Sequence, residues 1–382
     1  MLTNADIAEL TDWRRVLHRF PEVSGEEQAT AARVVTELAG TRPDQVVTGL
    51  GGHGVAAIWT GAAAGETVLF RAELDALPID EVGQPDWRST VAGKGHMCGH
   101  DGHMTILMAL ARLISRQRPA TGRVILLFQP AEEDGSGAAA VLADPRFAGL
   151  KPDWAFALHN MPGLPFGHAS LRAGTMMCAS QGMRVQLTGK TAHASMPETG
   201  TSPVDAVARL IPALLALGPG GVLDEAFRMV TITHARIGEA AFGISPGYGE
   251  LWVKLRTRDD GPMAALRAEA EALVRAEAAR DGLQVACLTR DDFAATVNDP
   301  DAITRLTTAL DALKIPHTDR NLPMRGSEDF GRFGGNGTKM AMMFLGSGAT
   351  CPQLHNPDYD FPDALIPLGA RLFQRVMTDI LG

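Results

Sequence analysis

The order of predicted strands and helices changes along this 382-residue chain, and the change limits the possible folds more than any other feature. In the first part, short apolar runs typical of buried strands alternate with helical patterns. The clearest runs are residues 55–59, 67–70, 124–128 and 154–158, with a helical pattern at residues 105–114. This alternation predicts an α/β fold with a central, mostly parallel sheet flanked by helices.

The order of the predicted elements changes at about residue 179. The elements then follow the order β-α-β-β-α-β of the ferredoxin-like motif, at residues 183–187, 203–217, 229–237, 250–256, 263–280 and 283–288. After Asp291 the first pattern resumes and ends in a helix from about Asp363. A chain of this length usually exceeds one hydrophobic core. We therefore expect one domain formed by residues 1–178 and 290–382, with residues 179–289 inserted as a second, α+β domain.

The N-terminal region predicts two helices. Apolar residues recur at helical spacing from Ile7 to Leu17, and the first helix should end before Pro21. Ser24 and Glu27 match the S-x-x-E capping pattern, which predicts that a second helix begins there and runs to about Gly40.

The composition excludes several classes of protein. A net charge of -9 and the lack of a basic stripe argue against a nucleic-acid partner. The N-terminus is polar and no apolar run reaches the length of a membrane span, so we expect a soluble, cytoplasmic protein that does not bind membranes. The four cysteines are too scattered for a disulfide framework, which leaves ligand or nucleophile as special roles: Cys98, Cys178, Cys287 and Cys351.

Residues 96–103, HMCGHDGH, form the densest cluster of chemically active side chains. Cys98 and His100 at a spacing of two can point into one site from a loop, and thiolate with imidazole suits a borderline transition metal. The alternative is a buried thiol beside surface histidines. That alternative is common for a single residue and much less so for a cluster of this density.

Other candidates follow predicted strands. Glu132 and Glu133 come directly after the strand that ends near Pro130, where open α/β sheets place their sites. One glutamate could bind a metal while the other takes a proton from water, although a pair of solvated loop acids is the plainer interpretation. His159 follows another apolar strand and His355 lies in LHNPDYDFPD, and either could be an ordinary core or surface histidine.

The chain resembles the hippurate hydrolase and N-acyl-amino-acid amidohydrolase branch of the co-catalytic metallopeptidases, which is related to the aminoacylases and the plant auxin-conjugate hydrolases. The resemblance covers nearly the whole length. It rests on segments that occur in the family's order: LHRFPEVSGEE, RAELDALPI, HMCGHDGH, FQPAEE, ALHNMPGLPFG, GKTAHASMPETGTSPVDA, GSEDF and LHNPDYDFPD.

This resemblance implies a metal-dependent hydrolase that cleaves the acyl-amide bond of N-acetyl, N-benzoyl or related amino acids. Two divalent ions (Zn, Mn, Ni or Co) would be held by Cys98, His100, Glu133, His159 and His355, with the thiolate shared. Glu132 would be the general base for metal-activated water. Asp75 would orient a ligand. His193, from the inserted domain, would polarise the scissile carbonyl.

In the family the inserted domain mediates dimerisation, and this histidine can reach the partner's site. The resemblance therefore implies a homodimer or a homotetramer. Two other functions stay open. One is a dipeptidase or acyl-diaminopimelate deacylase of the same family, and the other is a catalytically idle, metal-containing binding protein.

The chain departs from the family pattern at two positions. Glu73 stands where relatives often have Asp, and Gly243 replaces the asparagine of an N-x-I-P pattern that helps to hold substrate. The same segment reads G-I-S-P-G, the serine-hydrolase nucleophile pattern. We reject that interpretation because Pro246 has no N–H to contribute to an oxyanion hole.

Overall fold

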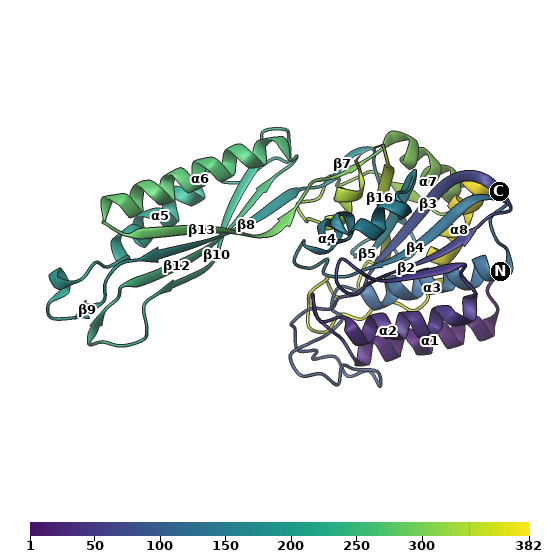
Figure 1. The fold of residues 1–382 in the computed structure, drawn as a ribbon, viewed down its shortest axis with the longest axis horizontal. Helices are drawn as coiled ribbons and strands as arrows, with labels where there is room; N and C mark the ends of the chain where they lie inside the picture. The colour runs from purple at the N-terminus through teal and green to yellow at the C-terminus, as the bar shows by residue number, and fades with distance from the viewer. Residues whose placement is uncertain (336) are drawn as a thin grey trace. The chain divides into compact units, whose positions relative to one another are not determined.

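The computed structural model describes residues 1–335 and 337–382, and the chain divides into two compact units (Figure 1). The first unit comprises Met1–Met176, Thr296–Leu322 and Glu328–Gly382. The second comprises Met177–Ala295 and Pro323–Ser327. The predicted insertion, residues 179–289, lies within the second unit.

An eight-stranded sheet organises the first unit, in the order β1-β2-β4-β3-β5-β16-β6-β15. The neighbouring pairs β4-β3, β3-β5, β5-β16 and β6-β15 are parallel, and the others are antiparallel. This confirms the predicted central, mostly parallel sheet. The strands are β1 (Gln45–Leu50), β2 (Gly54–Thr60), β3 (Ala63–Glu73), β4 (Thr121–Gln129), β5 (Trp154–Pro162), β6 (Ala169–Ser170), β15 (His317–Thr318) and β16 (Lys339–Gly348).

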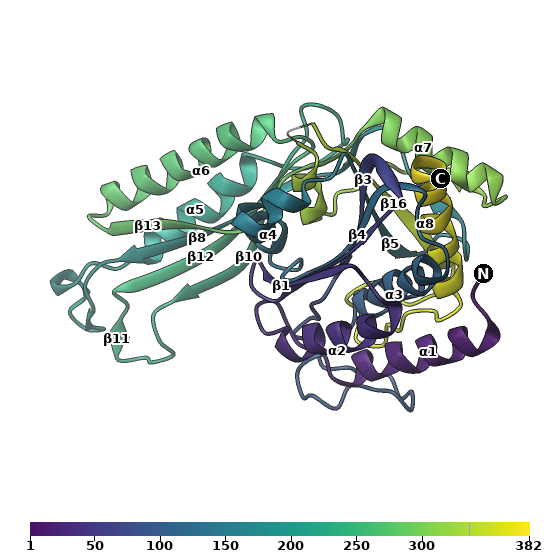
Figure 2. The same cartoon turned by 45° about the vertical axis from the view of Figure 1, so that its right-hand side comes forward.

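Helices α2, α3 and α8 lie against this sheet, and α1 packs on α3 (Figure 2). The main core packs helices α1, α2, α3, α7 and α8 against residues such as Trp59, Phe70 and Phe156. The central strands are buried on both faces, which is why their sequences read as continuous apolar runs. The helices are α1 (Asn4–Arg19), α2 (Gln28–Leu38), α3 (His100–Arg116), α4 (Gly137–Ala143), α7 (Pro300–Ala312) and α8 (Leu365–Leu381).

The second unit is an antiparallel sheet in the order β10-β12-β8-β13, with α5 and α6 on one face (Figure 1). Its elements follow the predicted β-α-β-β-α-β order. Alternate residues such as Met183, Val185 and Leu187 point into the core below the helices. The elements are β8 (Ala179–Thr188), α5 (Val204–Ala216), β10 (Arg228–Ile237), β12 (Tyr248–Thr257), α6 (Gly261–Arg280) and β13 (Gln284–Phe293).

Two further pairs of short strands complete the described structure. The first pair is β9 (Ala192–His193) with β11 (Ile244–Ser245), and the second is β7 (Gly174–Met177) with β14 (Thr296–Asn298). All four cysteines are free, as expected for a chain without a disulfide framework. Among the described residues, no helix combines the length and the apolar character needed to cross a bilayer.

The predicted capping box at the start of the second helix is wrong. Helix α2 begins at Gln28, and its N-cap residue Glu27 makes no side-chain capping bond. Instead, Ser24 Oγ donates to Asp75 Oδ2 at 2.7 Å, and Glu27 Oε1 accepts the backbone N–H of Ala131 at 2.8 Å. Both side chains therefore support the segments that follow β3 and β4.

Candidate active site

The candidate site lies where the carboxyl ends of β3 and β4 meet β5 and the start of α3. Parallel strands bring residues that are distant in sequence to one edge of the sheet. Asp75 follows β3, and Glu132 and Glu133 follow β4. His159 lies within β5 rather than after it, and His100 begins α3 rather than lying in a loop.

The backbone turn before α3 requires glycine. Gly99 adopts φ 93°, and a Cβ atom there would lie 2.3 Å from Asn160 Oδ1. This close approach places Cys98 beside β5, where its Sγ lies 3.4 Å from His159 Nε2. The small residue between Cys98 and His100 thus brings a thiol and two imidazoles together.

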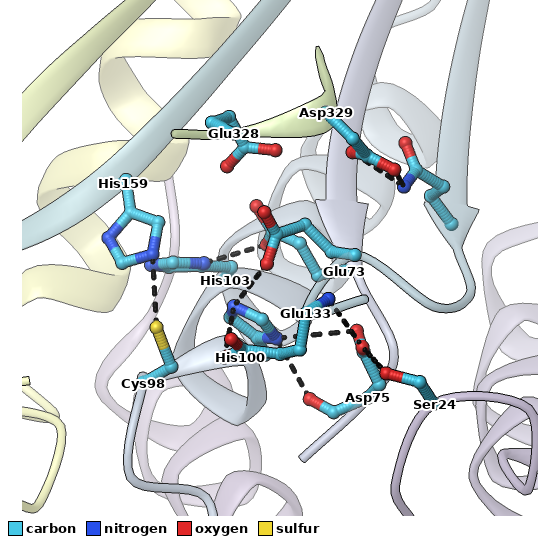
Figure 3. Close-up of polar contacts among 12 residues, drawn as sticks. Ser24, Glu73, Asp75, Cys98, His100, His103, Glu133, His159, Glu328 and Asp329 are labelled. Carbon is cyan, nitrogen blue, oxygen red and sulfur yellow. Dashed lines mark hydrogen bonds and ion pairs between the residues drawn. The ribbon is translucent and has the colours of Figure 1, made fainter. Parts of the chain in front are cut away.

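The five predicted ligands form overlapping groups, and Figure 3 shows four of them: Cys98, His100, Glu133 and His159. Potential ligand atoms of Cys98, His100 and His159 all lie within 4.8 Å of one another, and so do those of Cys98, Glu133 and His355. Cys98 belongs to both groups. This is the arrangement expected if a thiolate lies between two neighbouring ions.

Two buried atoms of this cluster test whether a cation fits. Neither His100 Nε2 nor Glu133 Oε1 has a hydrogen-bond partner among the described residues, although they lie 3.8 Å apart. Leaving such a group unsatisfied costs about 1–3 kcal/mol. Cations bound in the cluster would satisfy both atoms, and imidazole with thiolate and carboxylate is a donor set that divalent transition metals accept.

The electrostatics of the cluster also favour a cation. Burial, together with the Glu133 and Glu132 charges, raises the pKa of the Cys98 thiol well above its ordinary value. Burial raises the pKa of Glu133 to about 7 and that of Glu132 well above normal, with the Glu328 charge adding to the latter. A bound divalent ion would reverse this trend by stabilising the thiolate and the carboxylates.

Hydrogen bonds fix both buried imidazoles with Nε2 directed at the cluster. His100 Nδ1 lies 2.8 Å from the carbonyl oxygen of Asp75, and His159 Nδ1 lies 2.7 Å from that of Asn160. The Asp75 carboxylate accepts the Glu133 backbone N–H at 2.9 Å. Asp75 therefore helps to position both His100 and Glu133.

His103 belongs to the cluster although the sequence predicted no role for it. Its Nδ1 lies 2.7 Å from Glu73 Oε2, and its Nε2 lies 2.6 Å from Asn160 Oδ1. Its ring packs edge-on against His159, with centroids 4.7 Å apart. The spacing of three from His100 places both on one helix face, so this neighbour was detectable from the sequence.

A second acidic group surrounds Arg71 beside Glu132. The buried guanidinium donates to Glu328 Oε1 at 2.8 Å and to Asp329 Oδ1 at 2.6 Å, and it also pairs with Glu73. Carboxylate oxygens of Glu132, Glu328 and Asp329 lie within 4.8 Å of one another. The predicted base is therefore crowded by acids that come from the GSEDF segment.

The other predicted residues lie at the surface. The His355 side chain is 52% exposed, and its Nε2 lies 3.7 Å from Glu133 Oε2. His193 is an exposed residue of the second unit, where its Nδ1 lies 2.8 Å from Ser195 Oγ. Ser245 lies in β11, which leads into strand β12, so it is not in the strand-to-helix turn of a nucleophile elbow.

Comparisons with known proteins agree with this geometry. Residues 69–379 match the sequence model of Peptidase family M20/M25/M40. The chain is 28% identical over 373 residues to hippurate hydrolase of Campylobacter jejuni, covering 96% of this chain and 95% of that protein. It is 37% identical over 211 residues to N-acetyl-L-cysteine deacetylase of Bacillus subtilis, an alignment that spans 54% of this chain and 49% of the relative.

A solved structure has the same fold. The Bacillus subtilis YxeP protein, described as a dinuclear metal binding peptidase, superposes with a TM-score of 0.81 at 23% identity, covering 100% of this chain and 99% of that one. The chain therefore belongs to peptidase family M20/M25/M40 and is a metal-dependent hydrolase of amide bonds.

Proposed function

We propose that this enzyme cleaves the acyl-amide bond of N-acyl amino acids, with N-acetyl and N-benzoyl amino acids as the first candidates. The observation that carries the proposal is the pair of buried, unpartnered atoms His100 Nε2 and Glu133 Oε1 beside the Cys98 thiol. The relatives support the substrate class. Hippurate is N-benzoylglycine, and N-acetyl-L-cysteine is likewise an N-acyl amino acid.

We assign two divalent ions (Zn, Mn, Ni or Co) to the two overlapping groups. Cys98, His100 and His159 would hold one ion, and Cys98, Glu133 and His355 the other. When bound, the ions supply Lewis acidity towards water and the scissile carbonyl. The exposure of His355 leaves room for substrate beside it.

Glu132 is the proposed general base. Burial and the neighbouring Glu328 and Glu133 charges raise the pKa of its carboxyl well above the ordinary value. Its Oε2 lies 3.9 Å from His100 Nε2, close enough to face a water molecule in the cluster. Glu132 takes a proton from water as the water oxygen attacks the carbonyl carbon, and delivers that proton to the leaving nitrogen as the C–N bond breaks.

His193 and the second unit complete the proposal. The exposed His193 ring is available to donate to the carbonyl oxygen as negative charge develops there, in the site of a partner subunit. The second unit would mediate assembly into a homodimer or a homotetramer. The cytoplasm is the proposed compartment, because four free cysteines suit a reducing environment.

The test is a metal-restoration assay. The protein is stripped with chelator, reloaded with zinc or manganese, and assayed for amine release from N-acetyl and N-benzoyl amino acids. Turnover should require metal and disappear in Glu132→Ala. The matched control is Asp134→Ala, an exposed acid of the same loop, which should keep its activity. Turnover that survives Glu132→Ala would refute the assignment, and two bound metals without any turnover would favour the binding protein.

A further inference from the structure

The face of the second unit's sheet opposite α5 and α6 carries a notch lined by cationic side chains. Gly182 of β8 pairs with Lys254 of β12 on one side and with Arg290 of β13 on the other. A Cβ atom at position 182 would lie 2.9 Å from the Arg290 carbonyl oxygen. Glycine at this position lets the β8 backbone approach Arg290 closely, and it places no side chain between Lys254 and Arg290, which lie in register on either side.

The Trp252 ring lies next to the notch. Trp252 pairs with Arg184 one step along the same sheet face, and both line a cavity of about 270 Å³ with the notch residues. Trp252 is 46% exposed, yet its Nε1 donates to Glu250 Oε1 at 2.6 Å, and the centroid of the His234 ring lies 5.1 Å from that of its ring. The ring is thus held in place with part of its surface free.

The charge of the cavity is the opposite of that of the chain. Arg184, Lys254 and Arg290 line it against one carboxylate, Asp291, in a chain with a net charge of -9. Glu250 partly neutralises Arg184 at 2.7 Å. Arg290 donates only to the Thr289 carbonyl at 3.0 Å and pairs with no carboxylate in the part of the chain that the structure describes.

Lys254 is poorly compensated as well. Its side chain is 17% exposed, and its Nζ lies 3.3 Å from the Asp291 carbonyl oxygen, 3.4 Å from Asp291 Oδ2 and 5.2 Å from the Phe293 ring centroid. Both oxygen distances are long for a charged hydrogen bond. Asp291 has φ 44° and lies where the β13 register shifts, a strained conformation of the kind that collects at binding sites. An incoming anion would restore to Lys254 the solvation that burial removes.

We propose that this cavity binds a small aromatic carboxylate. The carboxylate would lie over Gly182 between Lys254 and Arg290, and the ring would pack against Trp252. The volume is slightly below the range of about 300–1,000 Å³ for drug-sized ligands, which favours a single-ring acid. The proposal rests on the second unit alone and does not depend on the catalytic assignment.

The test uses a local reporter in the metal-loaded enzyme. The five tryptophans are labelled as 5-fluorotryptophan, and Trp252→Phe assigns the Trp252 resonance in the ¹⁹F spectrum. Benzoate should shift this resonance saturably, with a midpoint in roughly the millimolar range. Acetate, which lacks the ring, and inorganic phosphate should bind at least about tenfold more weakly.

Paired variants decide the outcome. Lys254→Gln with Arg290→Gln should raise the benzoate midpoint at least about tenfold, because both charged donors to the carboxylate are lost. Arg275→Gln with Arg280→Gln removes two exposed cations of α6 and should leave the midpoint unchanged. The remaining four fluorotryptophan resonances report whether each variant is folded. The proposal is overturned if benzoate does not move the Trp252 resonance, if both double variants give the wild-type midpoint, or if acetate binds as well as benzoate.

Discussion

His18 of helix α1 should make the stability of the protein depend on pH. The side chain is fully buried, with Nδ1 2.9 Å from Asp101 Oδ2 and Nε2 3.3 Å from Glu81 Oε1. Asp360 Oδ1 lies 3.8 Å away, and the Arg14 guanidinium lies 3.4 Å from Nδ1. Burial and the Arg14 charge oppose protonation, but the hydrogen bonds to the carboxylates outweigh them and raise the pKa of His18 to about 9.

The sign and size of the effect follow from this pKa. Because the folded-state pKa lies above the unfolded value of 6.5, the stabilisation is fully present below about pH 6.5 and is lost as the pH rises through 9. At 1.36 kcal/mol per pH unit, the loss is about 3 kcal/mol. The ring centroid of His96 lies 6.2 Å from that of His18, and burial lowers the pKa of His96 to about 4. Its protonation therefore changes the stability of the protein only below pH 6.5.

The assay compares wild type with His18→Gln by denaturant unfolding at pH 6.5 and pH 9. A Trp252→Phe background leaves four tryptophans as reporters, all within the first unit: Trp13, Trp59, Trp87 and Trp154. Equal metal loading cancels the pH dependence of metal binding. The stability advantage of wild type over His18→Gln should shrink by about 3 kcal/mol at pH 9. His53→Gln is the control, and an advantage that is the same at both pH values would refute the reasoning.

Three substitutions probe other contacts. Asp75→Asn should weaken metal affinity about 10–100-fold in a chelator competition, and more than Ser24→Ala does, because only the former removes the charge beside the ligands; equal losses would contradict this role. Gly102→Ala places a Cβ atom 2.3 Å from the Phe361 ring and should lower the free energy of unfolding by about 1–3 kcal/mol, whereas unchanged thermal stability would show that the helix can shift freely. A Cβ atom at position 243 would meet no atom within 4 Å, so Gly243→Asn should leave the stability unchanged. Because it restores the asparagine of the family pattern, it should change KM for N-acyl amino acids. An unchanged KM across the panel would contradict a substrate role for this position.

Much of the fold could be predicted because the sheet strands are buried on both faces and carry continuous apolar sequences. Residues 55–59 and 124–128 lie within β2 and β4. The capping box failed for a physical reason. Ser24 and Glu27 have the spacing of a capping box, but their side chains form hydrogen bonds with Asp75 and with the backbone of Ala131 instead.

The candidate site was predictable only in part. Cys98 and His100 stand out because the motif is dense and short. Glu328 and Asp329 could not be predicted in this way. They contact Arg71 from more than 250 residues away in the sequence, and no short motif indicates such a contact. The role of Glu73 was also hidden, because its bonds to Arg71 and His103 exist only in the folded sheet.

The central claim is that five side chains of the first unit hold two ions while Glu132 stays free. The most direct measurement is anomalous diffraction at the zinc edge from crystals of the zinc-loaded protein. We expect two peaks about 3.5–4 Å apart, with Cys98 Sγ about 2.3 Å from both and Glu132 bound to neither. A single peak, peaks away from Cys98, or a Glu132 oxygen in the coordination sphere would contradict the assignment.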